Sequence, residues 1–297
     1  MKTGIYLSAA LMLLLPSGCI PSEHTGEVGV NISFAPSALT KGRIDPGDDQ
    51  VGCMSIFVYK DGRLYQDIRT PGVEADLVLE EGKTYGIYAL ANIETVSPPV
   101  FESDLDTLRF RMDAIDDLAD GLPMAFFGPG ALTAREGMHV KYNLTRLVSK
   151  WTLSMDLSKL HSVFIIESVR LRQAALDVTP FAPCSKAQRV GDGDWSEGLM
   201  NLTGKTVTLY ALENARGELL PANDNPFLKT REELSKVSSE SDLCTYLEIR
   251  ARWSLNGVSG IFNMRTYLGE NLCSDFSVMR NTAYSLRVSF SDGAPVE

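Results

Sequence analysis

Apolar and polar residues alternate along much of this chain with the period of two that a half-buried β-strand requires. The first clear case is residues 28–34, where Val28, Val30, Ile32 and Phe34 alternate with small or polar residues. Every second side chain of a strand points to the same face, so these four side chains should be buried together. The same alternation recurs in residues 207–211, 247–253 and 284–290.

Turn sequences separate the predicted strands. Lys60-Asp61-Gly62 follows an apolar run, and Asp-Gly at the centre of such a turn is typical of a β-hairpin. Glu81-Gly82 repeats this strand–turn–strand pattern further along the chain. We therefore expect two strand pairs in the first third of the protein.

The closing residues 265–290 combine apolar strands with a polar loop. Gly269 follows an apolar strand and permits a positive φ or a tight bend. Asp275 and Asn281 are residues that hydrogen-bond nearby backbone in turns. The pattern predicts a long hairpin that returns the last strand to a sheet.

Two segments follow the helical period instead. Residues 103–118 place apolar residues three or four positions apart, and Ser103 can cap the first turn. Thr230 precedes Glu233 by three positions, which is the spacing of a capping box. The apolar stripe of the first segment consists of Leu105, Leu108, Met112, Ile115 and Leu118.

Short strands separated by turns, with one or two short helices, are typical of β-sandwich modules rather than of a parallel α/β sheet. A Gly- and Pro-rich patch precedes a long strand-like segment at the middle of the chain, so we place a domain boundary near Thr145. The sequence thus predicts a mainly β protein with two β-sandwich modules, residues 28–145 and 146–297.

The composition of the 297-residue chain argues against several function classes. A formal net charge of −10 provides no basic footprint for nucleic acid. The sequence has three histidines, and it contains no P-loop, dinucleotide-binding glycine motif, nucleophile elbow or H-E-x-x-H motif. We therefore expect no enzymatic activity and no cofactor.

Two acidic turn segments could place several oxygen ligands around a calcium ion. Neither matches the EF-hand pattern, and Asp and Gly are favoured in turns in any case, so we predict no metal site. Trp195, in the second segment, could be a platform on which a sugar stacks, but the interpretation we favour is a Trp that partly covers the end of a sandwich. The acidic residues concerned are Asp45, Asp48 and Asp49 in the first segment, and Asp192, Asp194 and Glu197 in the second.

The N-terminus has the features of a bacterial lipoprotein signal. Lys2 precedes the apolar run from Ile5 to Leu15, which is too short to span a bilayer, and Cys19 follows small residues. We expect residues 1–18 to be a signal peptide and residues 19–27 to be a tether, with acyl chains such as palmitate on Cys19 anchoring the protein in the cell outer membrane. The alternative is an ordinary secretory signal.

Four further cysteines allow three disulfide connectivities, among which the sequence does not choose. Export makes disulfides feasible, and small buried thiols are the alternative. The four are Cys53, Cys184, Cys244 and Cys273.

The closing segment resembles that of the fimbrillin-like lipoproteins, the type V pilus proteins of anaerobic Gram-negative bacteria. Other stretches agree in order and spacing: residues 83–94, 121–128, 144–155 and the strand that leads to Glu213, Asn214 and Gly217. The similarity is scattered over most of residues 28–290, and Cys273 departs from the pattern. The matching residues of the closing segment are Tyr267, Leu268, Gly269, Asp275, Phe276, Arg280, Asn281 and Tyr284.

The resemblance implies a fimbrial (pilus) subunit or fimbrillin-like surface adhesin made of transthyretin-like sandwiches. In such pilins an arginine-specific protease can remove the first strand, and a neighbouring subunit then fills the groove by β-strand addition. By this resemblance the exchangeable strand is residues 28–34, and Arg43 is the candidate cleavage site; the alternative is a solvated arginine of a loop. Other pilus subunits would be the partners in the fimbrium, with a host protein or glycan as the adhesion ligand.

A second hypothesis is a monomeric surface lipoprotein that binds glycans. It would need exposed aromatic side chains on one face, and Trp195 is the residue around which we would expect them.

Overall fold

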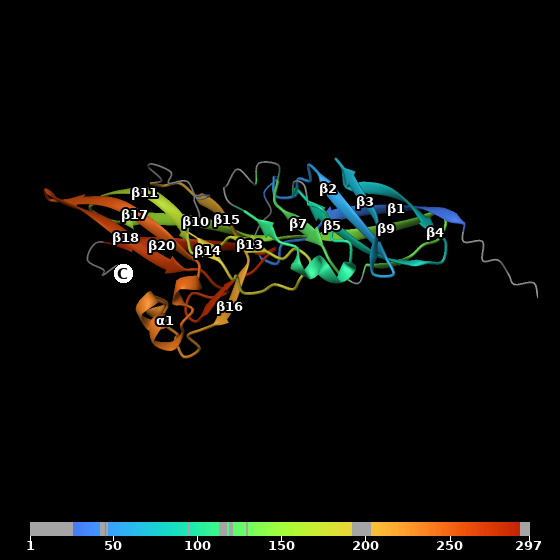
Figure 1. Cartoon of the computed structure of the whole chain (residues 1–297). Coiled ribbons are helices and arrows are strands. Elements are labelled where there is room, and N and C mark those ends of the chain that lie inside the picture. The colour runs from blue at the N-terminus through green and yellow to red at the C-terminus, as the bar shows by residue number, and fades with distance from the viewer. Residues whose placement is uncertain are drawn as a thin grey trace, which may run out of the picture.

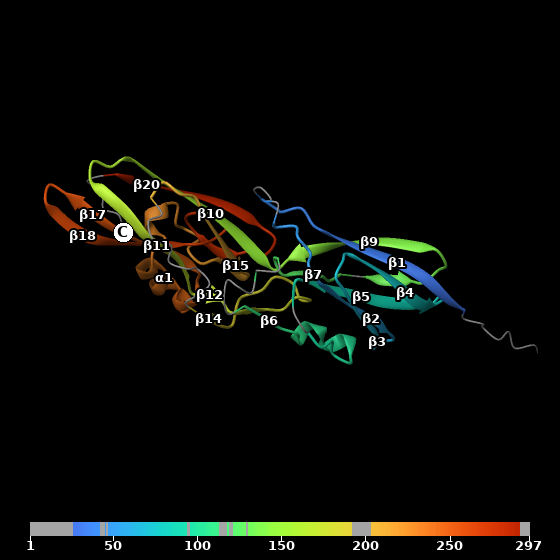
Figure 2. The ribbon, with the colours of Figure 1, turned by 90° about the horizontal axis from the view of Figure 1, so that it is seen from above.

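The computed structural model of this chain describes residues 26–41, 45, 47–93, 96–112, 118, 121–128, 130–191 and 203–291. The molecule is elongated, with two β-rich units that lie end to end (Figure 1 and Figure 2). The first strand lies at one end, and the hairpin of the last third of the chain lies at the other.

The first unit is a β-sandwich whose strands pair in an order far from their order in the sequence. Across the described residues the order is β3-β2-β5-β7-β9-β1-β4, and β8 pairs with β5. The apolar sides of these strands share one core. Their bounds are β1 Glu27–Pro36, β2 Met54–Lys60, β3 Arg63–Thr70, β4 Glu74–Glu80, β5 Thr84–Ala91, β7 Met124–Phe126, β8 Ala131–Thr133 and β9 Met138–Arg146.

The second unit packs the three-stranded sheet β15-β10-β20 against the three-stranded sheet β11-β17-β18. Phe290 of one sheet meets Phe164 and Phe262 of the other, with ring centroids 4.9 and 5.9 Å apart. Their bounds are β10 Val148–Lys159, β11 Val163–Arg172, β15 Val207–Leu212, β17 Tyr246–Leu255, β18 Val258–Tyr267 and β20 Ala283–Ser291.

Short strands complete the fold and join the two units. β6 pairs with β13, which brings Arg111 of the first unit opposite Asp177 of the second. Phe181 of the second unit packs against Phe57 and Tyr88 of the first, so the apolar core runs through the junction. The remaining bounds are β6 Phe110–Arg111, β12 Ala174–Ala175, β13 Asp177–Val178, β14 Val190–Gly191, β16 Asn214–Glu218 and β19 Asp275–Val278.

The structure confirms the mainly β fold class, and each alternating segment named above lies in a strand: β1, β15, β17 and β20. The hairpin of β2 and β3 turns at Asp61 and Gly62, both with positive φ. The turn at Glu81-Gly82 also exists, but its strands do not form a hairpin: β4 pairs with β1, while β5 pairs with β2. This turn passes the chain between the layers of the sandwich.

The long hairpin predicted for residues 265–290 is wrong. β18 pairs with β17, whereas β20 lies in the other sheet and runs parallel to β10. The connection between β18 and β20 also contains β19, which pairs with β16. A connection of this length does not impose the tight pairing that a two-residue turn imposes, so each strand joins a different sheet.

One of the two predicted helices is present. Helix α1, Arg231–Val237, is capped by Thr230, whose hydroxyl accepts a hydrogen bond from the Glu233 amide at 3.3 Å. The helix predicted for residues 103–118 is wrong in its described part, where a 3₁₀ helix ends at Thr107 and β6 begins at Phe110. Pairing with β13 overrides the helical pattern there.

The passage from the first unit to the second is short. β9 ends at Arg146 and β10 begins at Val148, with Leu147 between them. Within the described ranges, none of the helices has the length and apolar content that crossing a bilayer would require.

The close approach at Gly269 generates a testable prediction. A Cβ atom placed on Gly269 would lie 1.8 Å from the Asp275 carbonyl oxygen. Glycine is therefore required at this position because the two backbone segments lie so close together, and not because the residue has a positive φ. We expect Gly269→Ala to lower the free energy of unfolding by about 2 to 3 kcal/mol, as overpacked sites do. Gly29→Ala is the control, because no atom lies within 4 Å of its Cβ position. Equal melting temperatures for the two variants would contradict the prediction.

Candidate functional site

β1 lies between two strands of the first unit, so both of its edges are paired. It runs antiparallel to β4, from Glu27 opposite Glu80 to Ser33 opposite Glu74. It runs parallel to β9, from Val30 opposite Met138 to Pro36 opposite Leu144. The N-terminal strand is therefore an internal strand of the sheet.

The inward side chains of β1 are buried. Val28, Val30, Ile32 and Phe34 are 6, 1, 0 and 3% exposed. The Phe34 ring lies 6.1 Å from the Phe126 ring and 5.5 Å from the Tyr142 ring. At about 1.5 to 3 kcal/mol for each buried side chain, this face contributes on the order of 6 to 12 kcal/mol of gross hydrophobic stabilisation.

β4 depends on β1 for its place in the sheet. In the described strand order β4 is the terminal strand, and β1 is its neighbour. Removing β1 would leave β4 without its ladder and would expose the edge of β9, together with the apolar side chains that β1 covers. Unpaired edges of this kind pair readily with other strands.

The segment after β1 is docked at the junction of the two units. The Ser37 amide donates to the Leu144 carbonyl at 2.7 Å, which continues the pairing beyond β1. Asn281 Nδ2 donates to the Ala38 carbonyl at 2.9 Å, and the Thr40 amide donates to the Asn281 carbonyl at 3.0 Å. Residues 37–41 therefore tie the first strand to the second unit.

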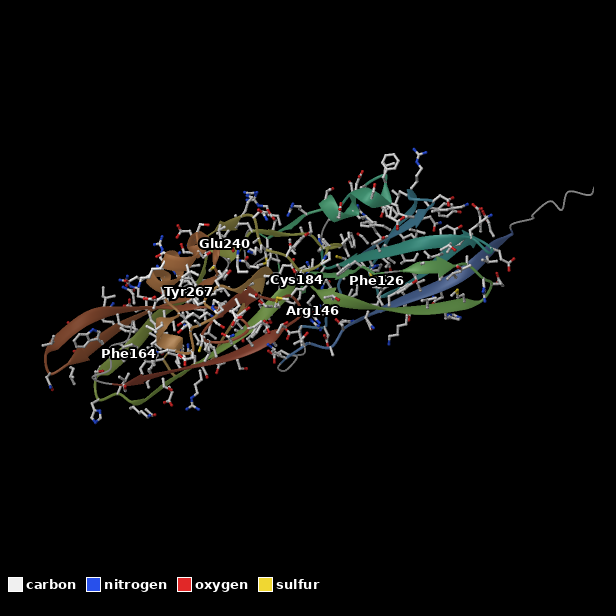
Figure 3. All side chains as sticks on the ribbon, turned by 90° about the horizontal axis from the view of Figure 1, so that it is seen from below. Phe126, Arg146, Phe164, Cys184, Glu240 and Tyr267 are labelled. Atoms are coloured by element: carbon white, nitrogen blue, oxygen red, sulfur yellow. The ribbon has the colours of Figure 1, made fainter. Side chains whose placement is uncertain are left out.

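Arg146 is the centre of this junction (Figure 3). The side chain is 1% exposed, and its guanidinium donates to the Ser37 carbonyl at 2.7 Å and to Asn281 Oδ1 at 3.0 Å. It also donates to the Asp48 carbonyl at 3.0 Å and forms an ion pair with Asp49. Such full pairing is what a buried guanidinium requires.

An acidic turn completes the junction. Lys150 Nζ lies 2.5 Å from Asp48 Oδ2 and 2.5 Å from Asp45 Oδ2, and the Tyr210 hydroxyl donates to Asp48 Oδ1 at 2.7 Å. Burial alone would raise the pKa of Asp48, but the hydrogen bonds from Lys150, the Asp45 amide and Tyr210 outweigh it and hold this pKa below its ordinary value. The carboxylates of the first segment considered as a calcium site, Asp45, Asp48 and Asp49, thus bind basic side chains, whereas the second segment lies outside the described residues.

The polar residues of the closing segment hold its loop, as the sequence suggested. Asp275 Oδ1 accepts hydrogen bonds from the Glu270 amide at 2.8 Å and the Ser277 amide at 2.7 Å. Arg280 forms a buried ion pair with Glu213, and both residues belong to segments that carry the fimbrillin-like resemblance. These groups have structural partners and form no catalytic arrangement.

All four described cysteines are free thiols in this structure. Cys244 is fully buried, and burial raises the pKa of the Cys184 and Cys244 thiols to about 12. Thiols with such pKa values are poor nucleophiles at neutral pH.

Several predicted sites lie outside the described residues. They are the signal peptide at residues 1–18, the lipidation site Cys19, the cleavage site Arg43 and the sugar platform Trp195. Arg43 lies two residues after Lys41, the last residue of the docked segment 37–41.

Sequence reasoning missed the junction residues Arg146, Lys150 and Tyr210. A signal for the first two was present, because each is a charge between apolar residues in the strand-like segment 144–153. Charged residues are rarely buried without a partner, so two such positions in one run indicate an internal polar network.

Comparison of the sequence gives limited information. The profile of a domain of unknown function, DUF4906, matches residues 209–288, within the second unit. No curated protein matches this sequence significantly.

Comparison of the structure is more informative. A C-terminally truncated form of the tip fimbrial protein Mfa3 from Porphyromonas gingivalis has a TM-score of 0.61, with 91% of this chain and 97% of that chain covered. This chain has the fold of the fimbrial proteins. The fimbrilin FimA of the same species has a TM-score of 0.55, with 89% of this chain and 90% of that chain covered. A fimbrial assembly protein from Parabacteroides distasonis has a TM-score of 0.53, with 90% and 93% covered.

Sequence identities to these three fimbrial proteins are 12, 9 and 10%, so the shared property is the fold. The fimbrillin-like resemblance of the scattered motifs is confirmed at that level. The similarity extends over both units of the fimbrial fold, whereas the matched profile covers part of the second unit.

The burial of β1 yields a prediction about stability. Ile32→Ala removes a fully buried side chain and should lower the free energy of unfolding by about 2 to 5 kcal/mol. Ser33→Ala, at the neighbouring position on the opposite face of β1, should change it by about 0.5 kcal/mol or less. Chemical denaturation of both variants measures the difference. If Ile32→Ala left the free energy of unfolding nearly unchanged, the buried face of β1 would contribute little to stability.

The lowered pKa of Asp48 yields a prediction about pH. Because the folded pKa lies below the unfolded value of about 3.9, the Asp48 interactions stabilise the protein fully above that value, and this stabilisation is lost as the pH falls through the folded pKa. We expect Asp48→Asn to be less stable at pH 7 by about 2 to 3 kcal/mol, with a smaller further loss below pH about 4 than the wild type shows.

The matched control for this pH experiment is Asp242→Asn, because Asp242 forms an exposed ion pair with Arg231. Its unfolding free energy should follow that of the wild type closely across the pH range. If the unfolding free energies of the wild type and of Asp48→Asn changed in parallel with pH, the assigned role of Asp48 would be contradicted.

Proposed function

We propose that this protein is a fimbrial subunit or fimbrillin-like surface adhesin that assembles by β-strand exchange. The observation that carries the proposal is the position of β1: an apolar strand at the start of the described chain, buried on one face and paired on both edges. A strand donated by a neighbouring subunit would find four apolar positions and two backbone ladders to occupy. The shared fimbrial fold supports this role.

Removal of β1 begins, in this proposal, with cleavage after Arg43. The released piece would comprise β1 and residues 37–41, so it must break the hydrogen bonds at Ser37, Ala38 and Thr40. Arg146 and Asn281 would then lose acceptors, and an incoming strand that extends past the groove would supply carbonyl groups in their place. Exchange therefore involves the junction as well as the groove.

Export and anchoring complete the proposal. The signal at residues 1–18 would direct the chain out of the cytoplasm, and lipid on Cys19 would hold it at the outer membrane until cleavage releases the remainder into the fimbrium. The role is non-enzymatic, since binding and assembly use the strand surfaces described above.

The test is digestion of the purified mature protein with an arginine-specific protease. We expect a new N-terminus at Ile44, followed by oligomers that resist SDS, because a strand held by two ladders and a buried face dissociates slowly. Arg43→Ala should remain uncleaved and should form no SDS-resistant oligomers. Arg63→Ala, which changes an exposed arginine beside the β2–β3 turn, should behave as the wild type.

A peptide experiment isolates the groove. After cleavage, a synthetic peptide of residues 27–37 should bind to the truncated protein and suppress oligomers. The same peptide with Ile32→Asp should fail, while the peptide with Ser33→Asp, altered on its outward side, should still bind. Cleavage elsewhere, or cleaved protein that forms no SDS-resistant oligomers, would refute the proposal.

A further inference from the structure

The outer face of the sheet β11-β17-β18 is unusually rich in arginine for a chain with a net charge of −10. Alternation along the strands places the arginines on the side opposite the core, where most are exposed. We call this surface the arginine face. Among the described residues, its charged side chains are Arg170, Arg172, Arg250, Arg252, Arg265, Glu167 and Glu248.

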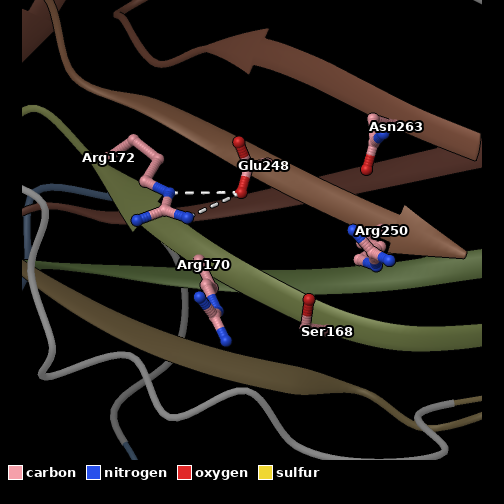
Figure 4. Close-up of a pocket in the computed structure, with 6 residues that line it drawn as sticks. All are labelled: Ser168, Arg170, Arg172, Glu248, Arg250 and Asn263. Carbon is pink, nitrogen blue, oxygen red and sulfur yellow. Dashed lines mark hydrogen bonds and ion pairs between the residues drawn. The ribbon is translucent and has the colours of Figure 1, made fainter.

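Five arginines against two glutamates leave a surplus of three positive charges on this face. Arg252 and Arg250 share Glu167 at 2.5 and 3.2 Å, and Arg172 binds Glu248 at 2.9 Å. Arg170 projects outward from β11 beside these pairs (Figure 4). Because residues two apart in a strand lie about 7 Å from each other, the charges form a compact array.

The opposite end of the molecule carries the opposite charge. Residues 26–146 contain 19 Asp and Glu against 11 Lys and Arg. On the outer side of β4, β1 and β9 the exposed residues include three acids, Glu27, Glu74 and Asp76, and one lysine, Lys141, with Asn31 donating to Asp76 Oδ1 at 2.8 Å. We call this surface the acidic face.

Both faces also expose aliphatic side chains. Ile165 and Ile261 flank Arg252 on the arginine face and are 40 and 57% exposed. Val78, which is 51% exposed, lies two residues from Asp76 on the acidic face. Each face therefore offers charge and apolar surface together, the mixture found in protein–protein contacts.

We propose that the arginine face of one copy docks on the acidic face of the next copy. The two faces lie at opposite ends of the elongated molecule (Figure 1 and Figure 2), so the contact joins different surfaces of the two copies and can repeat from copy to copy. The proposal rests on the proposed assembly function in naming a second copy as the partner. It adds a recognition step that places the second unit of one copy beside β1 and β4 of another.

A protein partner fits the arginine face better than a polysaccharide or a nucleic acid. Tyr246, the ring that could have stacked on a sugar, is 7% exposed and lies beneath the Arg265 guanidinium at 4.2 Å. A polyanion longer than the arginine face would also lie against the rest of the protein, whose net charge of −10 would repel it. A matching acidic protein surface of similar size avoids that repulsion.

The contact should be weak and sensitive to salt. Exposed ion pairs each change an association constant by a factor of about 1.4 to 5, and salt screens them beyond roughly 8 Å at physiological ionic strength. Docking of this strength favours encounter in the correct orientation, and strand exchange would then make it permanent.

The experiment measures self-association of the uncleaved mature chain by sedimentation velocity at about 20 mM and about 500 mM salt. We expect concentration-dependent association at low salt and loss of it at high salt. Reversing the arginine face with Arg170→Glu and Arg252→Glu should weaken association about tenfold, and so should reversing the acidic face with Glu74→Lys and Asp76→Lys. All four substitutions in one chain should restore it.

The control reverses two exposed arginines away from the arginine face, Arg231→Glu and Arg287→Glu, which produces the same change in net charge. This variant should associate as the wild type does. Circular dichroism confirms that each variant is folded.

Three outcomes would overturn the docking proposal. One is a wild-type protein that stays monomeric at low salt, and another is failure of the variant with all four substitutions to recover self-association. The third is binding of heparin, a sulfated polysaccharide, that is lost with Arg170→Glu and Arg252→Glu while self-association is unchanged. None of these outcomes bears on strand exchange, which is read from cleavage and SDS-resistant oligomers, so the two proposals fail separately.

Discussion

The first unit depends on the burial of one strand face between β4 and β9. Val28, Val30, Ile32 and Phe34 fill that space, and the backbone of β1 supplies the ladder that keeps β4 in the sheet. β1 is the first strand of the described chain.

The junction makes the two units respond together. Arg146 is buried and is satisfied by acceptors from the segment after β1, from the acidic turn and from Asn281 of the second unit. A guanidinium in such a place is costly without its partners, so loss of the first strand and of the segment after it would leave Arg146 without its Ser37 acceptor. The continuous apolar core around Phe181 reinforces the coupling.

Charge is distributed along the long axis rather than evenly. Alternation keeps ionised side chains on the outer sides of the sheets, and the sequence places acids on the first unit and arginines on the outer side of β11 and β17. A molecule with such ends is polar in the electrostatic sense, which suits a protein with the fold of fimbrial subunits.

Local sequence determined the strands, because alternation at β1, β15, β17 and β20 depends only on which side chains must face a core. It also determined the cap of α1 at Thr230, since this follows from the chemistry of single residues, whereas the close approach of Gly269 to Asp275 was decided by the tertiary structure. The apolar face of the first strand could be read in the same way. Tertiary structure decided which strands pair: β4 joins β1 rather than β5, β20 joins β10 rather than β18, and β6 replaces part of a predicted helix. Partners such as Arg146 with Ser37, or Lys150 with Asp48, lie about a hundred residues apart. Pairing and ion-pair formation over such separations depend on the packing of the whole chain, which no local pattern contains.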